Sequence, residues 1–135
     1  MQKAVGCFGF VLIFVFSAFG QTSVVGNWYG DSVCQVKNSK CKTEKVVYRI
    51  IQADDIGAKF FMHGDKIVNE KPEFMGTLEF GFDEKTKALT GKYGTDVWKY
   101  TINGKEMEGT LTLADGTIYR RIKVVKVECD GMPFL

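Results

Sequence analysis

The sequence predicts an exported all-β domain that closes into a single up-and-down antiparallel barrel of about eight strands. An apolar leader comes first, and short stretches of alternating apolar and polar residues fill residues 21–135. No stretch there has the roughly 3.6-residue apolar period of a helix. Short links imply antiparallel neighbours, and such a meander leaves two exposed edges unless the sheet closes. A β-sandwich is the alternative, but it usually needs a longer crossing connection, which the sequence lacks.

Residues 1–20 have the layout of a secretory signal peptide. Lys3 supplies the positive charge, Phe8–Phe19 is almost unbroken apolar sequence, and small residues lie just before the expected cut at Gln21. The apolar run is too short for a membrane span of about 20 residues. We therefore expect a secreted or periplasmic protein whose domain, residues 21–135, carries no transmembrane segment.

The first four strands are expected at about 24–34, 44–53, 58–63 and 74–82. Apolar residues alternate with polar ones in each, and 74–82 is the clearest half-buried strand. Asp54–Gly57 predicts the turn before the third strand. Gly64–Asp65 predicts a turn, Lys66–Val68 a short strand or the far half of a bent one, and residues 69–72 a loop.

The last four strands are expected at about 87–93, 96–102, 107–113 and 117–127. The first has a weak pattern, whereas the second alternates Trp98 and Tyr100 with polar residues. Asn103–Gly104 and Asp115–Gly116 predict tight hairpins on either side of the third.

The charge pattern argues against nucleic acid as a partner. The net charge is +2 at pH 7, and removal of Lys3 with the leader would lower it to +1. The basic residues of 120–126 lie on one alternating strand. They do not form the larger positive cluster that a phosphate-binding surface needs.

No catalytic or metal-binding motif is visible in the sequence. His63 is the single histidine, and there is no C-x-x-C pair or nucleophile elbow. A surface histidine at a strand end is the simplest interpretation of His63. We therefore expect no enzyme activity, no metal and no cofactor.

Three cysteines lie after the leader, so one bridge leaves one thiol over. Cys34 ends the first expected strand and Cys41 precedes the second, so both flank one loop. Cys129 follows the last strand, which should end beside the beginning of the first strand. A strand of about ten residues spans ~33 Å, far beyond the roughly 7 Å that a disulfide allows between α-carbons. The geometry predicts a Cys34–Cys41 bridge and a free Cys129.

Gly26-Asn27-Trp28 resembles the G-x-W motif of the lipocalins, a calycin-type barrel family. In that family the tryptophan closes one barrel end and an arginine of the last strand packs across it, a contact of about 0.5–2 kcal/mol. The resemblance implies a Trp28–Arg120 contact with Arg121 pointing outward. If Arg121 contacted Trp28 instead, the expected register of the last strand would be off by one residue. An ordinary core tryptophan is the alternative, and this chain is shorter than an ordinary lipocalin.

The resemblance also implies a small apolar ligand inside the barrel. The candidate lining residues are Tyr48, Phe60, Met62, Phe80, Trp98 and Tyr100. These side chains could equally fill the interior, since an eight-stranded barrel has room for either. The alternative function is a secreted interaction or enzyme-inhibitor barrel whose loops bind a protein partner. A cavity of roughly 300 Å³ or more would favour the small ligand.

Overall fold

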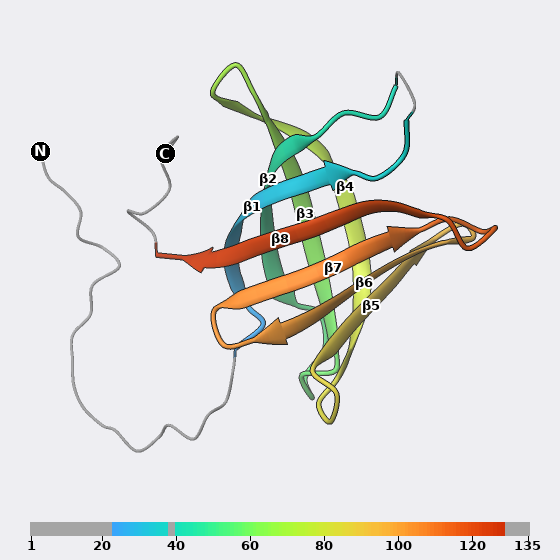
Figure 1. Ribbon diagram of the computed structural model, residues 1–135. Helices are drawn as coiled ribbons and strands as arrows, with labels where there is room; N and C mark the ends of the chain where they lie inside the picture. The colour runs from blue at the N-terminus through green and yellow to red at the C-terminus, as the bar shows by residue number, and fades with distance from the viewer. Residues whose placement is uncertain (1–22, 38–39, 129–135) are drawn as a thin grey trace, which may run out of the picture.

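The computed structural model describes residues 23–37 and 40–128, which form one closed antiparallel β-barrel with no helix among them (Figure 1). The strands are β1 Gly26–Cys34, β2 Glu44–Gln52, β3 Lys59–Val68, β4 Lys71–Asp83, β5 Ala88–Tyr93, β6 Asp96–Asn103, β7 Glu106–Thr112 and β8 Ile118–Val127. Each strand pairs with the next, and β1 pairs with β8. The predicted fold class is therefore confirmed. The predicted leader, residues 1–20, lies outside the described residues.

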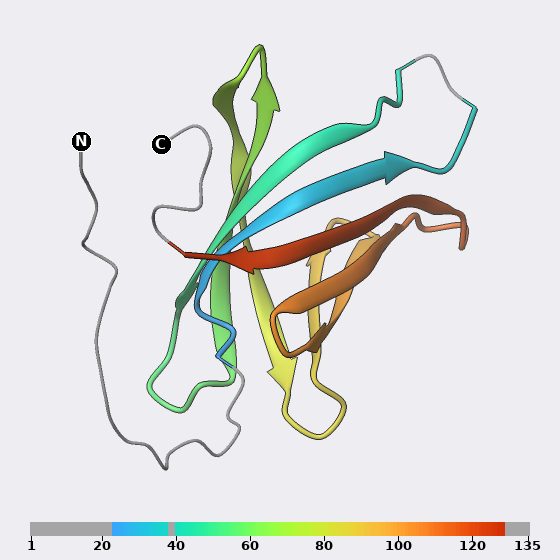
Figure 2. The same ribbon diagram turned by 60° about the vertical axis from the view of Figure 1, so that its left-hand side comes forward.

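The barrel has two unlike ends. At the packed end, β1 begins, β8 ends, and β4 turns into β5. At the open end, β1 leads into the loop to β2, and the β3–β4 and β5–β6 hairpins turn. These two hairpins lean away from each other in both views (Figure 2).

The first long hairpin differs from the sequence prediction. Gly64 and Asp65 lie inside a continuous β3 and do not form a turn. The turn comes at Asn69 and Glu70, which have φ of 53° and 66°. A tight hairpin needs two residues with positive φ, and asparagine tolerates that conformation. A register shift at Gly64/Asp65 marks a bulge in the pairing with β4.

Inward side chains fill the packed end with a dry core. Trp28, Ile50, Leu89, Met107 and Val124 are almost wholly buried within one cluster. Two inward glycines make room for large rings. A Cβ at position 91 would lie 2.9 Å from the Phe80 ring, and one at position 109 would collide with the Tyr100 ring. The core therefore depends on glycine opposite aromatic residues.

Trp28 closes the packed end, but its cationic neighbour is Lys126. The Lys126 Nζ lies 5.4 Å from the indole ring centroid and donates a hydrogen bond of 2.8 Å to the Ser23 carbonyl. The Trp28 indole N–H donates to the Val24 carbonyl at 3.1 Å. Gly26 permits this packing, because its φ is 144° and a Cβ there would lie 2.5 Å from Lys126 Cε.

The expected Trp28–Arg120 contact is absent. In the β1–β8 register Trp28 faces Lys126, whereas Arg120 faces Cys34 toward the open end. Arg120 does point inward and Arg121 is exposed, so the inward–outward phase was predicted correctly. The prediction was wrong in position along the strand, because phase alone cannot distinguish residues an even number of positions apart.

The loop between β1 and β2 is bridged by the predicted Cys34–Cys41 disulfide, with the two α-carbons 5.8 Å apart. Cys129 lies outside the described residues. The bridge joins the end of β1 to the loop before β2, at the open end. It therefore restrains this side of the opening.

Truncating Trp28 should destabilise the barrel strongly. Trp28→Ala should lower the free energy of unfolding by about 3–5 kcal/mol, because it leaves a cavity among buried residues. Lys126→Met keeps the length of the side chain and should cost less than about 2 kcal/mol. Urea unfolding of both variants checks this, and equal losses would show that Trp28 does not plug the end.

Removing the bridge should weaken the fold without changing it. Cys34→Ser/Cys41→Ser should lower the free energy of unfolding by about 2–3 kcal/mol, because a small closed loop is released in the unfolded chain. Urea unfolding measures the loss. Peptide mapping without reduction should recover a Cys34–Cys41 peptide, and a peptide linking either residue to Cys129 would contradict this pairing.

Candidate binding cavity

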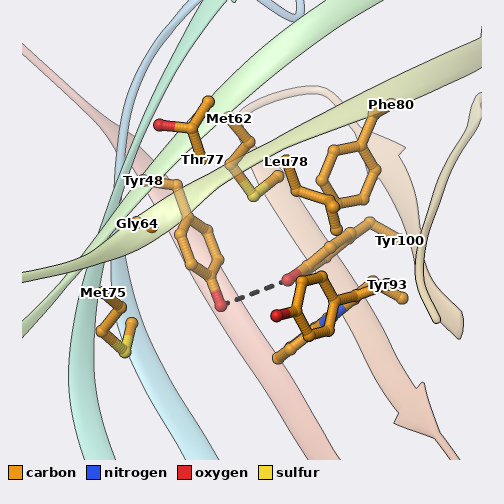
Figure 3. A pocket seen from close by; sticks show the side chains of 11 residues that line it. Tyr48, Met62, Gly64, Met75, Thr77, Leu78, Phe80, Tyr93 and Tyr100 are labelled. Carbon is orange, nitrogen blue, oxygen red and sulfur yellow. Dashed lines mark hydrogen bonds between the residues drawn. The ribbon is translucent and has the colours of Figure 1, made fainter. Parts of the chain in front are cut away.

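A cavity of about 480 Å³ lies inside the barrel toward the open end (Figure 3). It is surrounded by side chains and backbone of β2 to β6. The lining residues are Tyr48, Met62, Gly64, Met75, Gly76, Thr77, Leu78, Phe80, Tyr93, Trp98 and Tyr100. None of these side chains carries a charge at neutral pH, and most are aromatic or aliphatic. The cavity wall is therefore apolar, with a few hydroxyl groups.

The cavity exists because β4 and β5 pair over only a short distance. Their register covers Gly81–Asp83 and Ala88–Thr90, although β4 begins at Lys71 and β5 continues to Tyr93. Beyond these pairs the two strands separate toward the open end. The barrel wall consequently parts on this side, and the interior there is not filled from the facing strand.

Two glycines enlarge the space further. Gly64 on β3 pairs with Gly76 on β4, so neither strand projects a side chain into the cavity at this level. A Cβ at Gly64 would lie 3.6 Å from both Met75 Cε and the Tyr48 ring, which is ordinary contact. The space beside Gly64 is thus open enough for a side chain that the sequence does not supply.

Three aromatic rings in contact with one another separate the cavity from the packed core. The Tyr48 and Tyr100 rings meet edge to face with centroids 5.7 Å apart, and the Phe80 and Tyr100 centroids are also 5.7 Å apart. The Tyr100 hydroxyl donates a hydrogen bond of 3.2 Å to the Tyr48 hydroxyl (Figure 3). Edge-to-face pairs of this kind are favourable beyond the area they bury. They give the cavity a rigid floor.

Burial keeps both phenols protonated. Desolvation raises the pKa of Tyr48 to about 12, although the hydrogen bond from Tyr100 lowers it in part. Desolvation also raises the pKa of Tyr100 well above its ordinary value. Both hydroxyls therefore remain neutral donors throughout the physiological pH range.

The structure places five of the six predicted lining residues around the cavity: Tyr48, Met62, Phe80, Trp98 and Tyr100. Phe60 is buried elsewhere in the core, where its ring meets Phe82 edge to face at 6.1 Å. The sequence analysis missed Met75 and Tyr93 at the rim. Met75 falls in the β4 bulge, which breaks the alternation that assigns faces.

Charged side chains at the open end pair with one another. Arg120 donates to the Ser32 hydroxyl at 3.1 Å and lies 3.8 Å from a Glu44 carboxylate oxygen. Lys66 lies 3.9 Å from Glu44 and 3.8 Å from Glu73. This polar cluster joins β1, β2, β3, β4 and β8. None of its members lines the cavity.

His63, the single histidine of the sequence, pairs with a neighbouring threonine. His63 Nδ1 lies 2.7 Å from the hydroxyl of Thr77, its pairing partner on β4. Among residues 23–37 and 40–128 no group of three or more His, Cys, Asp or Glu side chains could hold a metal ion. Within the same ranges no helix is long and apolar enough to cross a membrane.

No family model, curated protein or solved structure matches the chain. The cavity must therefore be interpreted from its own geometry.

Alkaline pH should test the burial of the tyrosine pair. Because the pKa of Tyr48 in the folded protein, about 12, exceeds the ordinary value of about 10, the unfolded chain loses this proton first. The stabilisation is complete below about pH 10 and is lost as pH rises through the folded pKa, at roughly 1 kcal/mol per pH unit. Urea unfolding at several alkaline pH values should show this decline, and Tyr48→Phe/Tyr100→Phe should show a shallower one.

Proposed function

We propose that this protein is an exported binding protein that holds a small apolar molecule inside its barrel. The observation that carries the proposal is the uncharged cavity of about 480 Å³ between β2 and β6. Ligand sites in proteins are commonly apolar hollows of about 300–1,000 Å³ with a few placed polar groups. Export is part of the proposal because the first 20 residues have the layout of a signal peptide.

The shape of the interior favours a ligand over a solid core. Large rings fill the packed end, whereas Gly64 and Gly76 meet where a filled barrel would place side chains. Met62 and Met75 add flexible, polarizable contacts that adapt to ligands of different outline. The G-x-W motif at Gly26–Trp28 adds less support for a lipocalin-like role, because it is one short motif and Trp28 contacts Lys126 instead of Arg120.

The rim of the cavity offers an apolar route inward. Tyr93 is 74% exposed and Met75 is 48% exposed, and both line the cavity. Exposed apolar residues grouped at an opening are typical of binding sites. A hydrophobic molecule could thus reach the interior between β4 and β5.

A second function is a barrel that binds a protein through this end. The observation in its favour is Phe74, which is exposed beside Met75 on β4 and does not line the cavity. A protein partner would use the rim and leave the interior free. Filling the interior should therefore separate the two functions.

Gly64→Val should fill the cavity, because Gly64 has room for a Cβ and no positive φ. The neutral fluorophore N-phenyl-1-naphthylamine should bind the unaltered protein, and Gly64→Val should weaken binding at least about tenfold. The matched control is Gly81→Val, which places the same side chain on the exposed face of β4 with nothing within 4 Å of its Cβ. Fluorescence titration measures all three proteins.

Thermal unfolding should show that both variants fold. Equal affinity in Gly64→Val and Gly81→Val would place the probe outside the barrel. No binding to any of the three would favour the protein-partner function.

A further inference from the structure

Tyr48 and Tyr100 carry two hydroxyl hydrogens on the cavity floor, and only one of them forms a hydrogen bond within the described part of the chain. Tyr48 and Tyr100 are 4% and 1% exposed, and both line the cavity. Tyr100 donates to Tyr48 at 3.2 Å, so the Tyr48 hydroxyl acts as the acceptor and keeps its own hydrogen. Within residues 23–37 and 40–128 that hydrogen has no acceptor. If the bond ran the other way, the spare hydrogen would sit on Tyr100 and still face the cavity.

Such a group is unusual in a protein interior. Buried hydroxyls almost always find a partner, and the exceptions are explained by a bound water or ion, by strain or by a functional site. We propose that the ligand presents an uncharged acceptor oxygen, of the ketone, aldehyde, ester or amide type, to the Tyr48 hydroxyl. This inference rests on the proposed function and narrows the class of ligand from apolar molecules in general to apolar carbonyl compounds.

The surroundings favour a neutral oxygen over a carboxylate. No cationic side chain lines the cavity. The nearest cationic groups of the open end are already paired, Arg120 with Ser32 and Glu44, and Lys66 with Glu44 and Glu73. A carboxylate placed against the phenols would lose its hydration, and the nearby charge of Arg120 is already shared with Glu44. A carbonyl oxygen needs one donor, which the tyrosine pair offers; Thr77, Tyr93 and Trp98 also line the cavity.

The rest of the cavity matches an apolar body attached to that oxygen. Phe80, Leu78 and Trp98 present aromatic and aliphatic surface, and the two methionines can adjust to its outline. A hydrogen bond from the tyrosine pair would orient the ligand, with its oxygen toward the floor and its apolar part toward the opening.

Two probes of the same shape test this inference. 2-Acetylnaphthalene carries a carbonyl oxygen, and 2-isopropenylnaphthalene carries a methylene group in its place. Displacement of N-phenyl-1-naphthylamine should show that the ketone binds the unaltered protein about tenfold more tightly than the alkene, as expected for one buried hydrogen bond. Tyr48→Phe/Tyr100→Phe removes both hydroxyls, so it should abolish this preference and leave the affinity for the alkene unchanged within about twofold.

Two controls identify the donor and the charge. Tyr100→Phe leaves the Tyr48 hydroxyl in place and should keep the preference for the ketone. 2-Naphthoate should bind more weakly than the ketone. The carbonyl stretching band of the bound ketone should also shift to lower frequency than in an alkane solvent, a measurement that needs no variant.

Each outcome decides one point. Equal affinity for ketone and alkene, or a preference that survives Tyr48→Phe/Tyr100→Phe, would overturn this inference and leave the apolar cavity standing. Tighter binding of 2-naphthoate would overturn the neutral class of ligand. Failure of all three probes and of the fluorophore to bind would overturn the proposed function itself.

Discussion

The pairing of β1 with β8 is the constraint on which the rest of the structure depends. It closes the meander, so the inward side chains of all eight strands share one interior. It also sets Trp28 opposite Lys126 at the packed end and brings Arg120 beside Ser32 at the open end. A closed barrel leaves no strand free along its whole length, which matters for a protein proposed to work outside the cell. Without this ladder Trp28 and Lys126 would not meet at the packed end.

Eight strand pairs close the barrel, and the pair β4–β5 is the shortest, with only three residue pairs. This local shortage divides the interior into two parts. Near the packed end the rings of Trp28, Phe80 and Tyr100 meet aliphatic neighbours and exclude water. Toward the open end the strands diverge, and glycines replace the side chains that would fill the gap. Stability is thus concentrated in one half of the barrel and space in the other, and the tyrosine pair lies at the boundary between them.

Much of the fold could be predicted from the sequence because strand alternation and hairpin turns are local signals. The eight strands, their order and the Cys34–Cys41 bridge follow from such signals. The register between distant strands could not be predicted, because alternation repeats every two residues and does not favour Arg120 over Lys126. The bulge near Gly64 hid Met75 for a related reason: it inserts a residue that no periodic pattern anticipates. The cavity could not be predicted either, because it depends on how many residues of β4 and β5 pair, which only the three-dimensional structure shows.

The position of the tyrosine pair links binding to stability. Tyr100 packs on Phe80 and contacts Tyr48, so the same rings line the cavity and belong to the packed core. A ligand seated on this floor would bind the folded barrel and not the unfolded chain, and would therefore stabilise the protein in proportion to RT ln(1 + [L]/Kd). It would also supply contacts where β4 and β5 supply none to each other. The part of the barrel wall with the fewest strand contacts would then be stabilised most by the ligand. The ligand would occupy the space that side chains leave empty at Gly64 and Gly76.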